Sequence, residues 1–329
     1  MQVLYAKGSD CIHFNDIADN AIKYSFYKGI IKDIVKLKSN LVDLKLINKP
    51  LDIYHCHSAH SLHGIMKAKE LGAITVLQRD SCHILDMLEW CEEGNKIWQN
   101  KYPQSCDNLR ARTNLQFQLD EYAESDYILV ASKLEEQSFI NRGISKDKII
   151  RIPFTVDSDY FIPNKQDVGF KVVLSGGNSV RKGYPESMES CVKAGFTLHV
   201  IPNHPRGKQF MLSQLQNFSV ILGLTREDGY PQFVKEAMSC GLVPIVSNRN
   251  GCAELIKSGK NGFIVNIDDH NSMITQVANI LTLLSKKPKL RLKIGLEARQ
   301  TIQKRTWLDY SKDIYNMYVE LYNKHGNKN

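Results

Sequence analysis

Short runs of consecutive apolar residues alternate with longer amphipathic segments along most of the chain. Apolar runs of about four to eight residues are typical of strands buried on both faces, and the longer segments are typical of helices. We expect strands at Gln2–Tyr5, Asp52–Cys56, Ile74–Leu77, Tyr127–Val130, Lys148–Ile152, Lys171–Leu174, Leu198–Ile201, Val220–Leu224, Val243–Val246 and Phe263–Val265. This alternation predicts an α/β architecture with parallel sheets.

Helix boundaries follow from capping residues. The spacing predicts helices at Ser61–Leu71, Tyr184–Ala194 and, after a capping pattern at Thr306, Trp307–Leu321. Ser132-Lys-Leu-Glu135 is a capping box, so another helix should start directly after the strand that ends at Val130.

The periodicity stops between residues 157 and 170 and then begins again, which predicts two doubly wound domains. We expect a first Rossmann-like domain at 1–157, a linker at 158–170, a second domain at 171–305 and a terminal helix with its tail at 306–329. The segment Cys91 to Thr113 is long, polar and spotted with aromatic residues. It is either a binding insertion or an irregular lid.

Composition narrows the class of protein. With 329 residues, 43% hydrophobic and 24% charged, the chain can build real cores. No apolar run approaches the roughly 18–20 residues of a membrane span, and the N-terminus is too short and polar for a secretory signal. We therefore expect a cytoplasmic protein. The eight cysteines show no Cys-x-x-Cys spacing, which favours reduced thiols over a zinc site; Cys82, His83 and Cys91 are a weak metal alternative.

The formal net charge of +8 suits phosphate-bearing substrates or the anionic face of a membrane. No basic stripe interleaved with aromatic residues is present, so nucleic acid is not an expected partner.

Three polar segments should converge beyond the carboxyl ends of the second domain's strands, where open α/β sheets bind ligands. The first, Ser175 to Gly183, combines glycines with Arg181 and Lys182. The second, Thr225 to Pro231, carries acids and opens a helix, and the third runs from Ser247 to Glu254. Carboxylates accept hydrogen bonds from sugar hydroxyls, and a helix N-terminus favours an anion. The segments therefore predict a site for a phosphorylated, polyhydroxylated ligand.

The second half resembles family 4 retaining glycosyltransferases, which have the two-domain GT-B fold. The residues that carry this resemblance are Gly176, Lys182-Gly183, Asp228 to Glu236 followed by Ala-Met-Ser-Cys-Gly-Leu-Val-Pro, Gly251-Cys-Ala-Glu254 and Lys260-Asn-Gly262. Residues 120–322 match the family well and 1–120 only loosely. The resemblance implies an acceptor-side first domain, a nucleotide-sugar-binding second domain and a last helix that crosses back to the first domain.

The resemblance also implies roles for particular residues. Lys182, helped by Arg181, would neutralise the departing diphosphate; Glu236 would hold ribose hydroxyls; and Asp228 would face the donor sugar. We expect the donor site to contain Gly176, Gly177, Asn178, Gly183, Glu227, Gly229, Tyr230, Pro231, Glu236 and Glu254. No essential metal or other cofactor is implied, and the Asp157-Ser-Asp159 triplet is interpreted as structural.

The chain departs from the family pattern at several positions. The first acid, Asp228, is one methylene shorter than the family's Glu, and Glu227 beside it is a substitute. Gly177 replaces an arginine, a loss that Arg181 or Arg206 would have to cover. Arg79 stands where the family commonly has a histidine, so Arg79 and His57 are the candidate catalytic residues of the first domain.

These observations predict a retaining hexosyltransferase that moves a sugar from a nucleotide-diphosphate-sugar to a hydroxyl of a glycan or lipid-linked acceptor. The alternative is a catalytically impaired nucleotide-sugar-binding relative that acts as a partner subunit. A nicotinamide-dependent enzyme is disfavoured, because no Gly-x-Gly-x-x-Gly follows the first strand.

Overall fold

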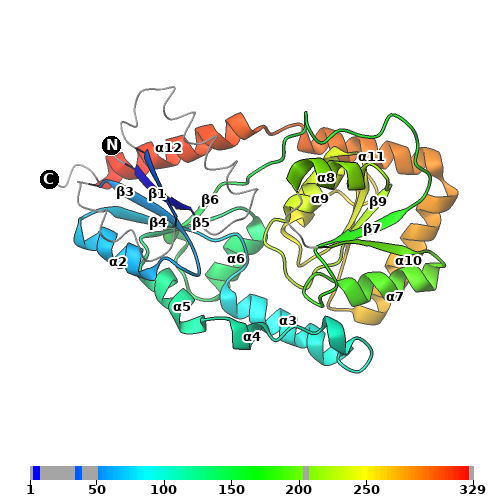
Figure 1. The fold of residues 1–329 in the computed structure, drawn as a ribbon, viewed down its shortest axis with the longest axis horizontal. Coiled ribbons are helices and arrows are strands. Elements are labelled where there is room, and N and C mark those ends of the chain that lie inside the picture. The colour runs from blue at the N-terminus through cyan, green and yellow to red at the C-terminus, as the bar shows by residue number, and fades with distance from the viewer. Residues whose placement is uncertain (1–2, 8–33, 39–50, 203–206, 326–329) are drawn as a thin grey trace.

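The computed structural model describes residues 3–7, 34–38, 51–202 and 207–325, and it contains two parallel sheets (Figure 1). The first sheet comprises β1 (Val3–Lys7), β2 (Ile34–Lys38), β3 (Ile53–His57), β4 (Ile74–Gln78), β5 (Tyr127–Val130) and β6 (Ile149–Arg151), in the order β2-β1-β3-β4-β5-β6. The second comprises β7 (Val172–Ser175), β8 (Leu198–Ile201), β9 (Val220–Gly223), β10 (Val243–Ser247) and β11 (Phe263–Val265), in the order β11-β10-β9-β7-β8. Each sheet belongs to one α/β domain, as expected.

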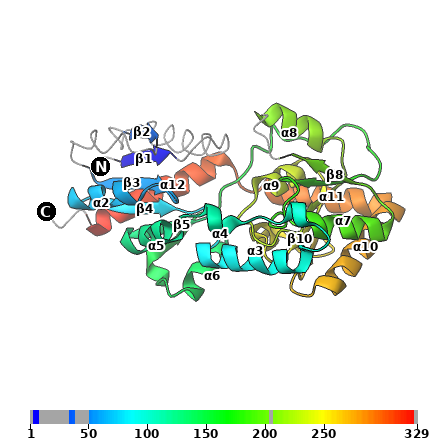
Figure 2. The same ribbon diagram turned by 60° about the horizontal axis from the view of Figure 1, so that its bottom comes forward.

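The described helices lie on the faces of these sheets and between the domains (Figures 1 and 2). They are α2 (Leu62–Glu70), α3 (Ile84–Trp98), α4 (Leu109–Arg112), α5 (Leu115–Glu124), α6 (Lys133–Asn141), α7 (Tyr184–Ala194), α8 (Gly207–Leu215), α9 (Gln232–Ser239), α10 (His270–Lys286), α11 (Pro288–Ile302) and α12 (Trp307–His325). Short 3-10 segments occur at Pro103–Ser105, Lys146–Lys148 and Gly251–Leu255.

All ten predicted strands are present, with ends that shift by one or two residues. The central strands of the second domain are buried on both faces; every residue of Val172–Ser175 and Val243–Ser247 is buried. That burial is why they appear as continuous apolar runs in the sequence. The prediction missed β2, an edge strand in which lysines alternate with apolar residues.

Helix α12 runs back from the second domain across the first sheet (Figure 1). It is longer than predicted, ending at His325 rather than Leu321. The Tyr318 hydroxyl lies 2.6 Å from Nδ1 of His55 in β3, and the Tyr127 hydroxyl of β5 lies 2.8 Å from Nε2 of His325. These contacts confirm the predicted crossover helix.

The segment that the sequence left undecided, Cys91 to Thr113, is largely ordered secondary structure rather than an irregular lid. Its first part completes α3, and a 3-10 turn and α4 follow. Both ribbon views show α3 extending from the first domain along the second (Figures 1 and 2). Residues near its end bond to the second domain; Trp98 Nε1, for example, donates to Glu186 Oε1 at 2.8 Å. The segment is a bridge between the domains.

Three smaller expectations also have outcomes. Asp157 Oδ1 accepts a hydrogen bond from the Tyr160 amide at 3.1 Å, which agrees with a structural role for the Asp157 triplet. All seven cysteines within the described ranges are free, whereas Cys11 lies outside them. Of the helices described here, none is long and apolar enough to cross a membrane.

Candidate functional site

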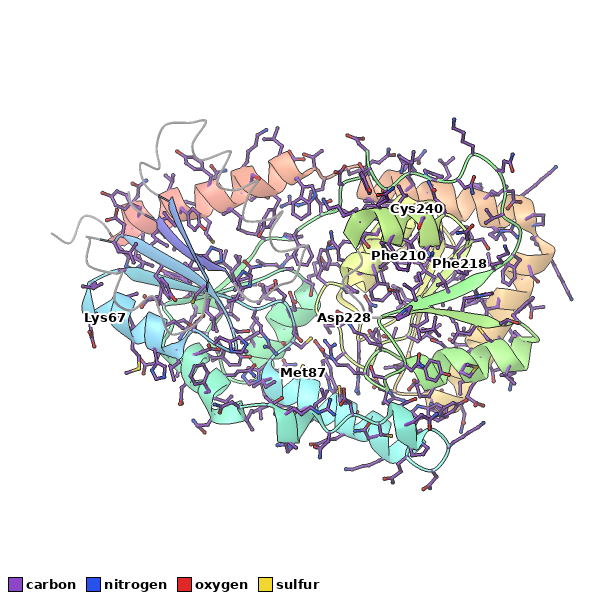
Figure 3. All side chains as sticks on the ribbon, in the orientation of Figure 1. Lys67, Met87, Phe210, Phe218, Asp228 and Cys240 are labelled. Carbon is purple, nitrogen blue, oxygen red and sulfur yellow. The ribbon has the colours of Figure 1, made fainter. Side chains whose placement is uncertain are left out.

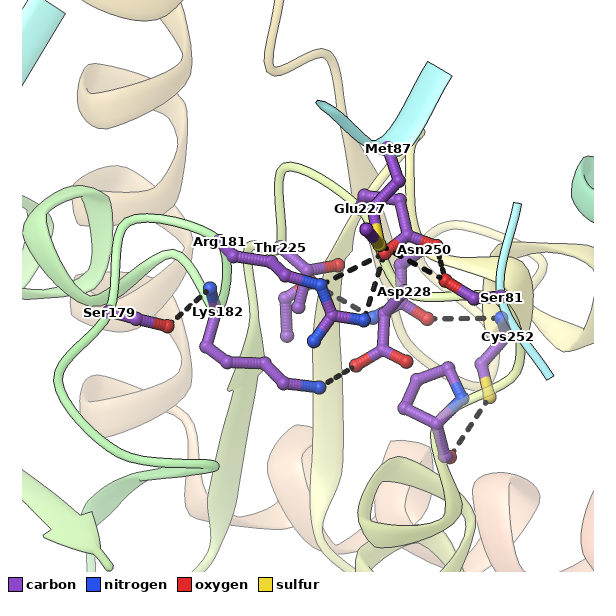
Figure 4. A network of polar contacts seen from close by, with 12 residues as sticks. Ser81, Met87, Ser179, Arg181, Lys182, Thr225, Glu227, Asp228, Asn250 and Cys252 are labelled. Atoms are coloured by element: carbon purple, nitrogen blue, oxygen red, sulfur yellow. Dashed lines mark hydrogen bonds and ion pairs between the residues drawn. The ribbon is translucent and has the colours of Figure 1, made fainter. Parts of the chain in front are cut away.

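The three predicted segments come together at the carboxyl edge of the second sheet, beyond β7, β9 and β10 (Figure 4). Backbone bonds join two of them: the Asp228 amide donates to the Arg249 carbonyl at 3.2 Å, and the Gly251 amide donates to the Asp228 carbonyl at 2.8 Å. The Arg226 amide donates to the Arg181 carbonyl at 2.9 Å, which connects the first segment to the second. Figure 3 places Asp228 at the junction of the two domains.

Lys182 and Asp228, the two residues predicted to meet the diphosphate and the sugar, form an ion pair. Lys182 Nζ lies 2.5 Å from Asp228 Oδ2, and both side chains are mostly buried, with 17% and 9% of their areas exposed. A partly buried pair is screened by salt much less than a surface pair. Each group therefore holds the other in place at the domain junction.

Arg181 and Glu227 form a second ion pair, and Glu227 of this pair also bonds residues of the first domain. Arg181 Nε and Nη2 lie 3.0 and 2.9 Å from Glu227 Oε2. Glu227 Oε1 accepts hydrogen bonds from Ser81 Oγ at 2.7 Å and from the Cys82 amide at 2.9 Å. Burial alone would raise the pKa of Glu227, but Arg181 and these donors outweigh it and lower the pKa. Glu227 is an interdomain carboxylate rather than a group exposed for donor binding.

Two glycines shape the first segment. Gly176 has a φ of +110°, and a Cβ there would lie 3.2 Å from the Lys182 side chain. Gly183 has a φ of +72°, and a Cβ there would lie 1.9 Å from the carbonyl oxygen of Leu224. Both positions therefore require glycine. Gly177 also has a positive φ of +84°, and Asn178 beside it is exposed.

The second segment approaches the first domain closely. Ser132 Oγ donates to the Gly229 carbonyl at 2.7 Å, and a Cβ on Gly229 would lie 1.9 Å from Glu135 Oε1. The Tyr230 ring is buried in the core rather than directed at a ligand. Pro231, the last residue of the second segment, is the N-cap of α9. The predicted backbone role of Gly229 and Tyr230 stays a prediction.

Helix α9 carries two buried ionisable residues in succession. Burial raises the pKa of Glu236 to about 8, against the opposing influence of Lys235 and Lys208. Burial lowers the pKa of Lys235 to about 7. The Lys235 ammonium lies 3.6 Å from the centroid of the Phe154 ring and 3.8 Å from that of Tyr230, contacts that favour its charged form.

The third segment ends at Glu254, which lies in the 3-10 segment Gly251–Leu255. Its Oε2 accepts a hydrogen bond from the Lys133 amide, at the start of α6, at 2.8 Å. Glu254 therefore contacts the first domain at a helix N-terminus, where a carboxylate is favoured.

The two candidate catalytic residues of the first domain lie at the ends of neighbouring strands. His57 is the last residue of β3, and Arg79 directly follows β4. His57 Nδ1 lies 3.3 Å from Asp80 Oδ2. Arg79 is buried, and its Nη1 donates to Gln118 Oε1 at 2.9 Å and to Ser58 Oγ at 3.1 Å. Arg79 Nε also donates to the carbonyl of Cys82 at 3.3 Å, and the Cys82 amide bonds Glu227, so Arg79 belongs to a polar network of the first domain that meets the second domain at Glu227.

Sequence reasoning missed a fully buried ion pair behind the site. Arg226 Nη2 lies 2.7 Å from Glu186 Oε1, with side-chain exposures of 2% and 0%. Glu186 is in the first turn of α7 and Arg226 directly precedes Glu227. Arg226 stands among the polar residues Thr225 to Asp228, which hides it in the sequence, and its partner is 40 residues away. Arg206, proposed as a phosphate contact, lies outside the described residues.

Comparison with known proteins agrees with this geometry. Residues 163–301 match the family described as glycosyl transferases group 1. The matched residues include most of the second domain and the end of the linker before it. The match contains the segment Ser175 to Gly183, the acids Asp228 and Glu236, and α9. The arrangement of both domains is the GT-B fold.

Two curated relatives match part of the chain. One is the N,N'-diacetylbacillosaminyl-diphospho-undecaprenol alpha-1,3-N-acetylgalactosaminyltransferase of Campylobacter jejuni, 25% identical over 148 residues. The other is the putative glycosyltransferase EpsD of Bacillus subtilis, 27% identical over 155 residues. The matches cover 45% and 46% of this chain but only 37% and 38% of the relatives' own lengths.

Solved structures match over nearly the whole chain. HepE from Anabaena, in complex with UDP-glucose, aligns with a TM-score of 0.71 and 14% identity, covering 97% of this chain and 100% of HepE. A glycosyltransferase from Rickettsia africae aligns with a TM-score of 0.65 and 14% identity, covering 97% and 98%. At such identities the likeness concerns the fold alone.

Proposed function

We propose that this protein is a retaining glycosyltransferase that transfers a sugar from a nucleoside-diphosphate-sugar to an acceptor hydroxyl. The observation that carries the proposal is the Lys182–Asp228 pair at 2.5 Å, held at the carboxyl edge of the second sheet beside a glycine-shaped segment. A cation and a carboxylate at this position match the two ends of the bond that must break. The cation suits the diphosphate, and the carboxylate suits the sugar hydroxyls.

In this mechanism Lys182 exchanges partners. Before donor binding its ammonium pairs with Asp228. The diphosphate of the donor would take over the ammonium, which leaves Asp228 to accept hydrogen bonds from the sugar. Arg181, oriented by Glu227, adds a second cation. As the glycosidic bond breaks, negative charge develops on the diphosphate, and cations already in place stabilise that charge without reorganising.

The nucleoside would lie along α9. Glu236, buried on that helix, is the proposed partner of the ribose hydroxyls. With its pKa raised to about 8, this carboxyl is protonated at neutral pH and can both donate and accept hydrogen bonds. The nearby glycines Gly176, Gly177 and Gly183 would allow the backbone to approach the phosphates, and Asn178 is exposed beside them.

UDP-sugars are the proposed donor class, supported by the fold likeness to HepE in complex with UDP-glucose. A lipid-linked glycan is the proposed acceptor. It is supported by the partial match to the diphospho-undecaprenol-specific enzyme of Campylobacter jejuni. The net charge of +8 agrees with a cytoplasmic protein that contacts an anionic membrane surface peripherally.

A non-catalytic nucleotide-sugar-binding partner subunit is the second candidate. It is favoured by one observation: Arg79, in the place where the family commonly has a histidine, is bonded to Gln118 and Ser58 within its own domain. Binding of a donor without any turnover across a broad acceptor panel would support this candidate over the first.

A donor screen tests the proposal. Thermal-shift measurements with UDP-, GDP-, ADP- and TDP-sugars should show stabilisation by one nucleotide class, and the shift should be lost in Lys182→Ala. Lys133→Ala, a nearby lysine whose backbone amide but not side chain contacts the site, is the matched control and should respond like wild type. Failure of every donor to stabilise the wild-type protein would refute the proposed function.

A further inference from the structure

Helix α3 and the turn that follows it belong to the first domain by sequence, yet several of their hydrogen bonds reach the second domain near Ser175 to Gly183, which we call the phosphate segment. The Cys82 amide, just before α3, donates to Glu227, and Trp98 at its end donates to Glu186. In the 3-10 turn beyond, the carbonyl of Ser105 accepts a hydrogen bond from the Val180 amide at 2.8 Å. Val180 directly precedes Arg181 and is fully buried.

The middle of α3 is fitted to the same region. A Cβ on Gly94 would lie 2.6 Å from Val180 Cγ1 and 3.1 Å from Arg226 Nε. Only glycine lets the helix approach the second domain this closely. These contacts therefore run from the start of α3 to its end, and they involve Val180, Glu186, Arg226 and Glu227 around the segment that carries Arg181 and Lys182.

One of these contacts reaches Arg181 through a buried carboxylate, and another reaches Arg226, whose amide donates to the Arg181 carbonyl at 2.9 Å. Ser81 and Cys82 bond one oxygen of Glu227, whose other oxygen holds Arg181. Trp98 bonds the same Glu186 oxygen that holds Arg226. Because Glu227 and Glu186 are fully buried, their positions are set by these few donors and not by water.

From these contacts we infer that residues 81–105 position Arg181 for the donor diphosphate, so that residues of the acceptor-side domain set the affinity for a phosphate held by the other domain. Ser81 and Trp98 are positioning residues in this scheme, because they act through Glu227 and Glu186. The inference rests on the proposed function, since it assumes that Arg181 meets the diphosphate.

The test compares UDP with UMP by titration calorimetry in wild type, Ser81→Ala and Trp98→Phe. The dissociation constant of UMP divided by that of UDP isolates the contribution of the second phosphate. It should fall about tenfold in each variant, the lower end of what a hydrogen bond to a charged acceptor contributes. A purely structural weakening would move both dissociation constants together and leave the ratio unchanged.

Glu93→Gln is the matched control. Glu93 also lies on α3 and also bonds the second domain, through Arg249 Nη1 at 2.8 Å, but Arg249 keeps a second carboxylate partner in Asp268. In Glu93→Gln, the ratio of the UMP dissociation constant to the UDP dissociation constant should equal that of wild type. If the wild-type protein binds UDP while Ser81→Ala and Trp98→Phe retain the wild-type ratio, this inference is overturned and the proposed function stands. If the wild-type protein binds neither nucleotide, the inference and the proposed UDP-sugar donor class both fall, and the donor screen decides the proposed transferase activity separately.

Discussion

The glycine at the start of α7 offers the sharpest test of how the phosphate segment is built. Gly183 and Gly195 flank the same helix with nearly identical backbone angles: φ is 72° and 75°, and ψ is 28° at both. They differ in their surroundings. A Cβ on Gly183 would lie 1.9 Å from the Leu224 carbonyl oxygen, whereas a Cβ on Gly195 would have no atom within 4 Å.

An alanine substitution at either site costs about 1–2 kcal/mol for the left-handed backbone. At Gly183 the carbonyl must also move by more than an ångström to restore ordinary contact. Overpacking of this kind adds about 1–3 kcal/mol. We expect Gly195→Ala to lower the free energy of unfolding by about 1–2 kcal/mol and Gly183→Ala by about 2–5 kcal/mol. Leu224 leads directly into the segment that carries Asp228, so Gly183→Ala should also abolish donor binding while Gly195→Ala preserves it.

Urea unfolding measures the two stabilities, and ligand-induced thermal shift measures donor binding. Equal destabilisation by the two substitutions would refute the close approach of Gly183 to Leu224. Intact donor binding in a folded Gly183→Ala variant would refute the placement of the donor between these segments.

Three further predictions concern the packing around the site. Lys235→Met should remove a pH dependence of stability, because burial lowers the pKa of Lys235 from 10.5 to about 7. Between those pH values the free energy of unfolding of wild type should rise relative to that of the variant, by at most about 1.4 kcal/mol per pH unit. A pH-independent difference between the two proteins would contradict this. Ser132→Ala removes the α6 cap and a bond to the second domain, and urea unfolding should show a loss of about 1–2 kcal/mol; no loss would argue against the capping box. Gly94→Ala forces α3 away from Val180 and should cost about 1–3 kcal/mol in the same assay, with an unchanged midpoint as the contrary result.

Local chemistry explains which parts of the fold could be predicted. Strands such as Val243–Ser247 are buried on both faces and so show uninterrupted apolar runs, and the Ser132 capping box marks a helix start within four residues. The edge strand Ile34–Lys38 was missed because pairing on one side leaves alternation instead of a run. The bridge was left undecided because its polar residues find partners far along the chain, as Trp98 does 88 residues away.

The sequence predicted which residues gather at the site better than it predicted which partners their side chains bond. Lys182 and Asp228 lie on two of the segments that were expected to converge, and their side chains form an ion pair. Glu227 and Asp228 are adjacent acids, and nothing local distinguishes them, yet one bonds the first domain and the other bonds Lys182. That choice depends on Ser81 and Cys82, which are 146 and 145 residues away in sequence. Tertiary contacts decide which of two equivalent carboxylates is available to a ligand.

The central claim is that Lys182 stabilises the departing diphosphate of a nucleotide-sugar. The most direct measurement is release of the nucleoside diphosphate from the donor identified in the screen, by wild type and Lys182→Ala, with a polyprenyl-linked acceptor present. The account predicts steady release by wild type and a rate at least about a hundredfold lower in the folded variant, the usual effect of removing one preorganised charge from a transition state. Equal rates for the two proteins would contradict it.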